Sequence, residues 1–253
     1  MCELLGMCFN KKVKPYISFR GLMGRSRRNP HGWGIARWVG GVWQVFKEPI
    51  RANTSSLANF VQHYPTFESK MFVGHVRYAT RGIKAFKNTH PFVRPFRRRE
   101  VIFAHNGSIS MRFGSRLKFF PVGDTDSEKL FCHILTEMSR NNLNISFSDF
   151  YAIENLMRRF NQYGTMNILF SNGNYLYVYR DIHGHRNLFL LERRSPFGII
   201  YICDEDWEID MDLGKDASTY GVIIASKPLT KGESWIPIPN GNLKVFKNGR
   251  CIY

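Results

Sequence analysis

Short apolar segments punctuated by glycine, proline and asparagine run through this 253-residue chain and constrain its fold more than any other feature. The stretch GWGIARWVGGVWQVFKEP is typical of a β-hairpin, with a turn at Gly40-Gly41 between an apolar strand and an alternating aromatic one. Met71–Tyr78 and Val101–His105 are predicted to be two further strands that end in polar, turn-prone residues. A second hairpin is predicted around Asn172-Gly173, and later strands in LFLLERR, GVIIASKPL and NLKVFKNGRCIY. The chain is therefore expected to build antiparallel sheets.

Two helices are predicted between these groups of strands. In TDSEKLFCHILTEMSR, Thr125 is a capping candidate with Glu128 three residues later, and the apolar residues that follow repeat at helical spacing. SFSDFYAIENLMRRFNQYG has the same periodicity and is predicted to end at Gly164, a residue type that favours helix C-caps. No repeat, linker or low-complexity tract divides the sequence, so residues 1–253 are expected to form a single α+β domain. Two antiparallel sheets covered by helices would account for this order of elements.

Composition argues against several classes of protein. The sequence has no run of about 18 apolar residues that could cross a membrane, and its first residues lack the charged and apolar regions of a secretory signal. The five cysteines are scattered and include no C-x-x-C pair. This pattern disfavours a disulfide framework or a structural zinc site, and it favours a reducing cytoplasm.

Positive charge is concentrated in the first half of the chain. The formal net charge is +16, and residues 1–130 contain 23 Lys and Arg against 7 Asp and Glu, whereas residues 131–253 contain 13 of each. The basic runs are RSRR (Arg25–Arg28) and RPFRRR (Arg94–Arg99). Such a field attracts nucleic acid, acidic substrates or acidic proteins, but the runs carry no helix-turn-helix, zinc-finger or RRM signature. Solvated loop charge is the favoured interpretation, and steering of an acidic partner is the second.

The cysteine directly behind the initiator methionine is a candidate nucleophile. Removal of Met1 would give Cys2 both a thiol and a free α-amino group, which places a base beside a nucleophile. The plainer alternative is that Cys2 is a small buried hydrophobic residue, as most free cysteines are.

Four polar clusters interrupt the apolar strands of the first half, each at a predicted strand end or helix start. At such places a scaffold presents side chains and backbone N–H groups to a ligand. The clusters are HVRYATRG (His75–Gly82), NTHPF (Asn88–Phe92), HNG (His105–Gly107) and GDTDSE (Gly123–Glu128). Taken singly, each has a structural interpretation: a core histidine at position 75, a hairpin turn at Asn106-Gly107, and a helix cap at Asp126.

Taken together with the cysteine, the clusters supply the parts needed to hold a glutamine or γ-glutamyl group. An arginine can bind a carboxylate through two parallel hydrogen bonds, and an aspartate at a helix start can hold an ammonium group. An asparagine side chain beside a glycine N–H can form an oxyanion hole. A thiolate could then attack the side-chain carbonyl of the bound group.

The chain resembles the class II glutamine amidotransferases, in which the nucleophile is the N-terminal residue. The resemblance rests on the cysteine after Met1 and on GWGIA, HVRYATRG, NTHPF, HNG and TDSE in family order, over residues 2 to about 130. The MCELLGM start, the WIPIPNGNLKVF tail and the lack of a synthase domain resemble the stand-alone YafJ-like branch. The resemblance implies a four-layer αββα sandwich, two antiparallel sheets between helical layers, and it requires no cofactor and no metal.

Roles for individual residues follow from the same resemblance. Cys2 would be the nucleophile, with its own α-amine relaying the proton. The Asn106 side chain and the Gly107 N–H would form the oxyanion hole. Arg77 would bind the substrate α-carboxylate, and Asp126 the α-ammonium group. Two supporting positions in the pocket complete the set, namely Thr80 and His90.

Several functions remain open from the sequence. Free glutamine could supply ammonia to a separate synthase partner, or the substrate could be a γ-glutamyl peptide that is hydrolysed without a partner. The alternative from another class is a basic protein that binds nucleic acid or an acidic partner without catalysis. A catalytically dead relative kept as a binding subunit is disfavoured, because every expected pocket position carries the expected residue type.

Overall fold

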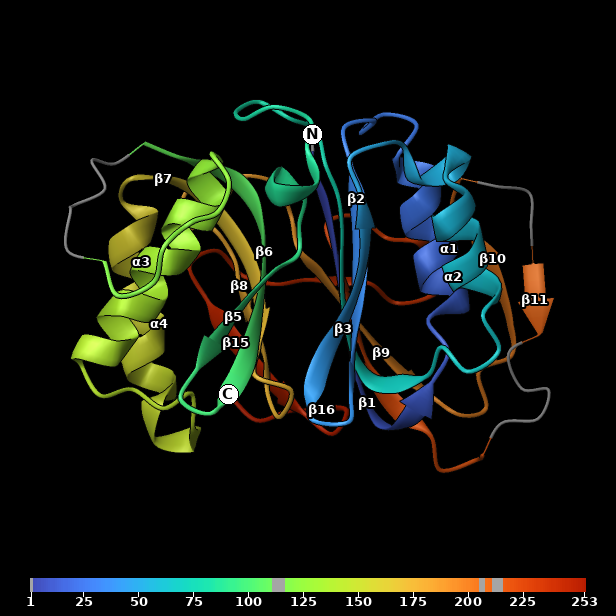
Figure 1. The fold of residues 1–253 in the computed structure, drawn as a ribbon. Coiled ribbons are helices and arrows are strands. Elements are labelled where there is room, and N and C mark those ends of the chain that lie inside the picture. The colour runs from blue at the N-terminus through green and yellow to red at the C-terminus, as the bar shows by residue number, and fades with distance from the viewer. Residues whose placement is uncertain (1, 111–116, 205–207, 211–215) are drawn as a thin grey trace.

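Two antiparallel sheets stack face to face at the centre of the computed structural model, which describes residues 2–110, 117–204, 208–210 and 216–253 (Figure 1). Within these residues, sheet A has the strand order β14-β9-β12-β1-β4-β2-β3, and sheet B has the order β16-β15-β8-β7-β6-β5. A small third sheet, sheet C, has the order β11-β10-β13. Neighbouring strands pair antiparallel, as the hairpin-rich sequence predicts.

The strands of sheet A are β1 (Glu3–Val13), β2 (Trp33–Val39), β3 (Val42–Glu48), β4 (Ser69–Val76), β9 (Phe189–Arg194), β12 (Tyr220–Ala225) and β14 (Ile236–Pro237). Those of sheet B are β5 (Phe92–Phe96), β6 (Arg99–Ile109), β7 (Gly164–Ser171), β8 (Leu176–Tyr179), β15 (Leu243–Lys247) and β16 (Arg250–Cys251). Sheet C contains β10 (Ile199–Ile202), β11 (Glu208–Asp210) and β13 (Thr230–Lys231).

Helices cover the outer face of each large sheet. Helices α1 (Tyr16–Arg25) and α2 (Ser56–His63) lie on sheet A, and α3 (Asp126–Arg140) and α4 (Phe150–Asn161) lie on sheet B (Figure 1). The order helix, sheet, sheet, helix confirms the predicted four-layer αββα sandwich. None of the described helices is long and apolar enough to cross a membrane.

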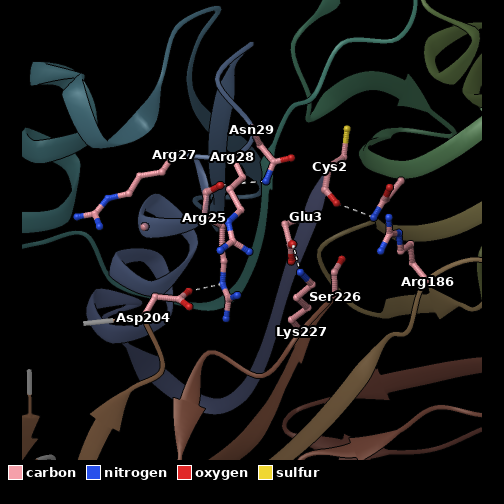
Figure 2. Close-up of a pocket in the computed structure, with 12 residues that line it drawn as sticks. Cys2, Glu3, Arg25, Arg27, Arg28, Asn29, Arg186, Asp204, Ser226 and Lys227 are labelled. Carbon is pink, nitrogen blue, oxygen red and sulfur yellow. Dashed lines mark hydrogen bonds and ion pairs between the residues drawn. The ribbon is translucent and has the colours of Figure 1, made fainter. Parts of the chain in front are cut away.

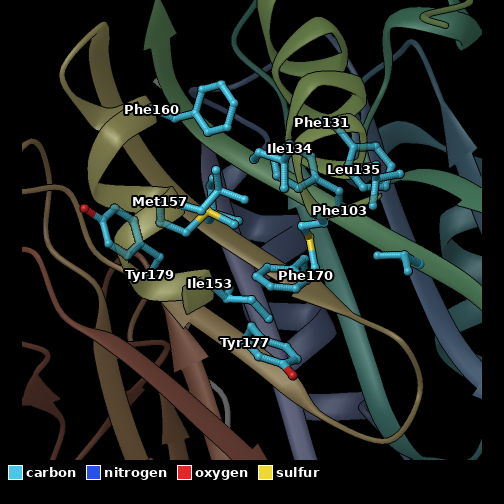
Figure 3. Close-up of a cluster of buried hydrophobic side chains, with 14 of the residues drawn as sticks. Phe103, Phe131, Ile134, Leu135, Ile153, Met157, Phe160, Phe170, Tyr177 and Tyr179 are labelled. Carbon is cyan, nitrogen blue, oxygen red and sulfur yellow. The ribbon is translucent and has the colours of Figure 1, made fainter. Parts of the chain in front are cut away.

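Each interface between layers has its own apolar core. Under α3 and α4 the core is aromatic: Phe103 stacks on Phe131 with ring centroids 4.7 Å apart, and Phe170 stacks on Tyr177 at 4.3 Å (Figure 3). A second core lies under α1 and α2, and a third fills the space between the two sheets. Buried apolar area is the main stabilising term in folding, and the three cores fix the spacing of the layers.

Several local features differ from the sequence-based expectations or were absent from them; among the strands, β1, β5 and β10 were not predicted. Strand β6 does not end at His105 but continues to Ile109, because residues 106–109 pair with β7. Helix α4 ends at Asn161, and Gly164 is the first residue of β7 rather than a helix C-cap. Helices α1 and α2 were not predicted; α1 contains two glycines and β-branched or aromatic residues, which are weak helix formers held here by packing. The Ser55 cap, whose side chain accepts from Ala58 N, was the available signal for α2.

Candidate active site

The alternation of side chains along two central strands brings Cys2 and Asn106 together. In β1, Leu4 and Cys8 lie in the core between the sheets, so Cys2, two residues before Leu4, is on the same side. In β6, Ile102 and Ala104 lie in that core, and Asn106 continues their alternation from the opposite sheet. The Asn106 side-chain Nδ2 donates to the backbone oxygen of Cys2 at 2.7 Å. The edge between the two sheets therefore places an amide beside the thiol-bearing residue.

The Cys2 thiol is half-buried against the loop that follows β4. Its Sγ accepts from the backbone N–H of Tyr78 at 3.2 Å and lies 3.5 Å from the Tyr78 oxygen. Burial raises the pKa of this thiol, although the Tyr78 backbone contact and the nearby Arg77 charge act in the opposite direction. Cys2 is therefore held as a thiol at neutral pH, and a nucleophilic role requires a base that removes its proton.

Glycine at position 107 is dictated by a close approach between strands. A Cβ atom there would lie 2.0 Å from the backbone oxygen of Thr165 and 2.6 Å from Nε2 of His105. Asn106 and Gly107 pair with Asn167 and Met166 of β7, so they are strand residues and not a hairpin turn. This rules out the turn interpretation and leaves the Asn106 amide rigidly presented toward Cys2.

Arg77 organises the loop after β4. It is 3% exposed, and its Nη1 donates to the oxygen of Ile83 at 3.1 Å, while Nη2 donates to the oxygens of Arg81 (2.8 Å) and Gly82 (3.3 Å). Burial lowers the pKa of this guanidinium, and the charges of Cys2 and Asp126 partly offset the effect. Arg77 is thus a buried cation within electrostatic reach of both of these residues.

Asp126 is the first residue of α3 and faces the end of β6. Its Oδ2 accepts from the backbone N–H of Ile109 at 2.9 Å, and its Oδ1 accepts from the N–H of Ser127 at 3.0 Å. Thr125 caps the helix by accepting from the N–H of Glu128, as the sequence predicts. A carboxylate also complements the positive end of the helix. The interpretation of Asp126 as the helix cap is therefore wrong, since Thr125 is the cap. Each Asp126 oxygen keeps a further lone pair for a ligand.

The two supporting positions occupy different environments. Thr80 is exposed on the loop after β4, whereas His90 is 3% exposed and stacks on His75 with ring centroids 4.2 Å apart. The ring nitrogens of both histidines have no hydrogen-bond partner among the described residues. Burial lowers the pKa of His75 to about 3, so its ring is neutral. His75 is therefore a core histidine, but one whose polar atoms are left unsatisfied.

A cavity of about 290 Å³ opens beside Cys2 and Asn106 (Figure 2). It extends toward the turn after α1 and the end of β12, and its lining includes Glu3, Arg25, Arg28 and Lys227. Of the seven predicted site residues, Cys2 and Asn106 line it, and the described lining does not include the other five. Arg77 follows β4 and Ser226 follows β12, and these strands flank β1 on opposite sides.

Comparison with known proteins identifies the family. Residues 1–253 match the family described as glutamine amidotransferases class-II. The chain belongs to the class II glutamine amidotransferases. It is 38% identical to the putative glutamine amidotransferase YafJ of Escherichia coli, over 100% of both chains. It is 41% identical to an uncharacterized protein of Methanocaldococcus jannaschii, over 100% of this chain and 71% of that one.

A solved structure supports the fold of this amidotransferase. The chain matches the crystal structure of a predicted glutamine amidotransferase from Pseudomonas aeruginosa with a TM-score of 0.74, over 100% of both chains and at 24% identity. The family assignment confirms the resemblance drawn from the motifs. It does not favour the alternative of a basic binding protein without catalysis.

Two residues of this amidotransferase that hydrogen-bond to the loop after β4 were not singled out from the sequence. Asn88 is fully buried. Its Nδ2 donates to the oxygen of Ile83 at 3.1 Å, and its Oδ1 accepts from the N–H of Asp124 at 2.8 Å. It thereby ties the Arg77 loop to the segment that leads into α3. His31 accepts from the N–H of Ala79 through Nδ1 at 2.9 Å and supports the same loop. Asn88 lies in the NTHPF motif and His31 directly precedes GWGIA, but only the tertiary contacts reveal these roles.

Proposed function

We propose that this chain hydrolyses the γ-amide of glutamine or of a γ-glutamyl compound, with Cys2 as the nucleophile. The observation that carries the proposal is the contact between the Asn106 amide and Cys2, at the mouth of a cavity. This contact fixes an amide donor against the backbone of the residue that carries the thiol. Acyl transfer needs a donor near the nucleophile, because negative charge develops on the carbonyl oxygen as the thiolate adds.

The proposed reaction proceeds through a covalent intermediate. The Cys2 thiolate forms a bond to the γ-carbonyl carbon, and the oxyanion accepts hydrogen bonds from the Asn106 Nδ2 and the Gly107 N–H. Collapse breaks the C–N bond, and the leaving nitrogen takes a proton and departs as ammonia or an amine. Water then adds to the γ-glutamyl thioester, releases glutamate and returns the thiol.

The proton carrier in this scheme is the α-amine of Cys2. Burial raises the pKa of the thiol, so a base is needed next to it. A free α-amine titrates near pH 8 (about 7.7–8.0), close enough to neutrality to accept a proton and return it to the leaving group. This role requires removal of Met1, which lies outside the described residues.

Arg77 and Asp126 are proposed to hold the α-carboxylate and the α-ammonium group of the substrate. A guanidinium has five N–H donors, and the described bonds to the loop carbonyls use three of them. The Nε–H and one N–H of Nη1 remain, and each can donate a hydrogen bond to a carboxylate oxygen. Thr80 and His90 are proposed to support this part of the pocket. The ammonia released from glutamine could supply a separate synthase, and an acidic protein is a candidate for that partner.

Replacing Arg77 by lysine is expected to lower kcat/KM for glutamine and γ-glutamyl dipeptides by about tenfold or more. A lysine ammonium cannot reproduce the planar set of five donors, which holds three loop carbonyls and still has N–H groups left for a carboxylate. The measurement is glutamate release at several substrate concentrations. Arg37→Lys is the matched control, since Arg37 is also buried and hydrogen-bonded to loop oxygens but lies in β2. Wild-type kcat/KM in the Arg77 variant would show that the proposed orientation of the substrate is wrong.

A further inference from the structure

The cavity beside Cys2 lies where the leaving group of the proposed reaction would be. The γ-carbonyl carbon carries the glutamyl chain on one side and the nitrogen on the other. The glutamyl chain is assigned to Arg77 and Asp126, neither of which is in the described lining of the cavity. Ser226 and Lys227, which are in the lining, follow β12 on the other side of β1. The nitrogen and its substituent therefore point into the cavity.

The size of the cavity exceeds what ammonia requires. Its volume is about 290 Å³, whereas a water molecule, which is similar in size to ammonia, occupies about 30 Å³ in the liquid. The space suits an amine with several further heavy atoms. The cavity therefore favours a substituted γ-glutamyl amide over free glutamine.

The charge of the lining indicates the chemistry of that substituent. Among the described residues of the lining, five side chains are cationic and two are carboxylates. Each carboxylate has a cationic partner: Asp204 Oδ2 lies 2.8 Å from Arg25 Nε, and Glu3 Oε1 lies 3.7 Å from Lys227 Nζ. Positive charge remains in excess after both pairs are formed, so the cavity is suited to an anion.

Arg25, Glu3 and Lys227 in the cavity lining are held in place by hydrogen bonds and ion pairs. Arg25 also donates from Nη2 to the oxygen of Pro228 at 2.7 Å, which joins the end of α1 to the segment after β12. Glu3 is 7% exposed, and burial raises the pKa of its carboxyl while Arg25 and Lys227 oppose that shift. The ion pairs Arg25–Asp204 and Lys227–Glu3 therefore hold these side chains in place. Arg27 and Arg28 are exposed to solvent. In Figure 2 the Arg28 side chain extends into the middle of the lining residues.

We infer that this cavity is a leaving-group subsite that selects γ-glutamyl amides of anionic amines, which bear carboxylate or phosphate groups. The inference rests on the proposed function and specifies its substrate class. Among the described residues, Arg28 provides positive charge without an ion-pair partner in the middle of the lining, where it recognises the anionic substituent; Arg27, whose side chain extends away from Cys2 in Figure 2, adds positive charge at the edge of the cavity. The basic RSRR run, which the proposed reaction does not otherwise use, thereby has a role in specificity.

The test compares two substrates of equal size that differ by one charge, γ-Glu-Glu and γ-Glu-Gln. The wild-type protein is expected to hydrolyse γ-Glu-Glu with about tenfold higher kcat/KM, an effect that added NaCl reduces by screening. In the double variant Arg27→Gln/Arg28→Gln this ratio is expected to fall toward one. Both arginines are changed together because exposed neighbouring side chains can replace each other. Arg25 and Lys227 are left intact, since their loss would leave Asp204 and Glu3 unpaired.

The matched control is Arg98→Gln/Arg99→Gln, which removes the same charge at the opposite end of β6. Arg98 is exposed in the turn between β5 and β6, and Arg99 is exposed at the start of β6, so the control should keep the wild-type ratio. γ-Glutamyl-phosphoethanolamine distinguishes the two sources of negative charge. Higher kcat/KM for it than for γ-Glu-Glu assigns the subsite to phosphate, and lower kcat/KM assigns it to carboxylate.

Binding to the Cys2→Ala variant, measured by calorimetry, separates this inference from the proposed function. The subsite is supported if the Cys2→Ala variant binds γ-Glu-Glu more tightly than γ-Glu-Gln and if this preference disappears when Arg27 and Arg28 are also replaced by glutamine. This result would support the subsite even if the wild-type chain releases no glutamate. A substrate ratio near one in the wild type overturns the subsite even where hydrolysis is fast. An unchanged ratio in the Arg27/Arg28 variant, accompanied by loss of oligonucleotide binding, also overturns it and assigns these arginines to a nucleic-acid surface.

Discussion

Replacing Cys2 by alanine is expected to abolish glutamate release, with a fall in kcat of about 10⁶-fold, the order that loss of a catalytic nucleophile causes. The substitution removes only the sulfur, which is half-buried and contacts the Tyr78 backbone. The fold and the cavity should therefore be retained. Glutamate release and the melting temperature are measured on the same preparation, which distinguishes a lost nucleophile from a lost fold.

The control for this substitution is Cys251→Ala, which removes an exposed sulfur at the C-terminal end of the chain. It should keep full activity. Glutamate release by the Cys2 variant at more than a few per cent of the wild-type rate would exclude a γ-glutamyl thioester on this residue.

Replacing Asn106 by alanine is expected to lower kcat by roughly 10²–10³, or about 2.7–4 kcal/mol, the usual effect of losing one oxyanion-hole donor. The KM should change by no more than a few-fold, because the carbonyl oxygen carries its full negative charge only after the thiolate has added. The same substitution removes the 2.7 Å bond to the Cys2 oxygen. Loss of one such bond costs about 0.5–1.5 kcal/mol of stability, which is too little to account for the expected loss of activity.

Asn161→Ala is the matched control for Asn106. Asn161 is also fully buried and donates from Nδ2 to Gly164 and Asp181, but it lies at the end of α4. It should lower the melting temperature and leave kcat per folded molecule close to wild type. A lower melting temperature with unchanged kcat in the Asn106 variant would remove Asn106 from the mechanism and leave it a structural role alone.

Hairpins and helices that are marked by residues a few positions apart could be predicted from the sequence. The Gly40-Gly41 hairpin, the Thr125 cap and the apolar spacing of α3 all depend on residues a few positions apart, and the structure has each of them. The four-layer arrangement depended on recognising the family motifs, since strand patterns alone do not specify how sheets stack. Helix α1 was missed because its packing on sheet A compensates for weak helix formers.

The geometry of the candidate site was harder to predict, because it depends on the pairing register of strands β6 and β7. The polar run at Asn106-Gly107 looked like a turn, since Asn-Gly pairs favour turns. Pairing with β7 over residues 102–109 keeps it in the strand. The role of Asn88 depends on two loops that meet only in the folded chain. The basic cavity likewise combines residues near positions 25, 186, 204 and 227, and no local pattern joins them.

The most direct test of the account is where the electrophilic glutamine analogue 6-diazo-5-oxo-norleucine attaches. Intact-mass measurement and peptide mapping should find one adduct per chain, on Cys2, in chains from which Met1 has been removed. The other cysteines, Cys8, Cys132, Cys203 and Cys251, should remain unlabelled, since a pocket that holds both α-substituents delivers the reactive carbon to one thiol. Labelling spread over these cysteines, or full activity in chains that keep Met1, would contradict the proposed nucleophile and its α-amine base.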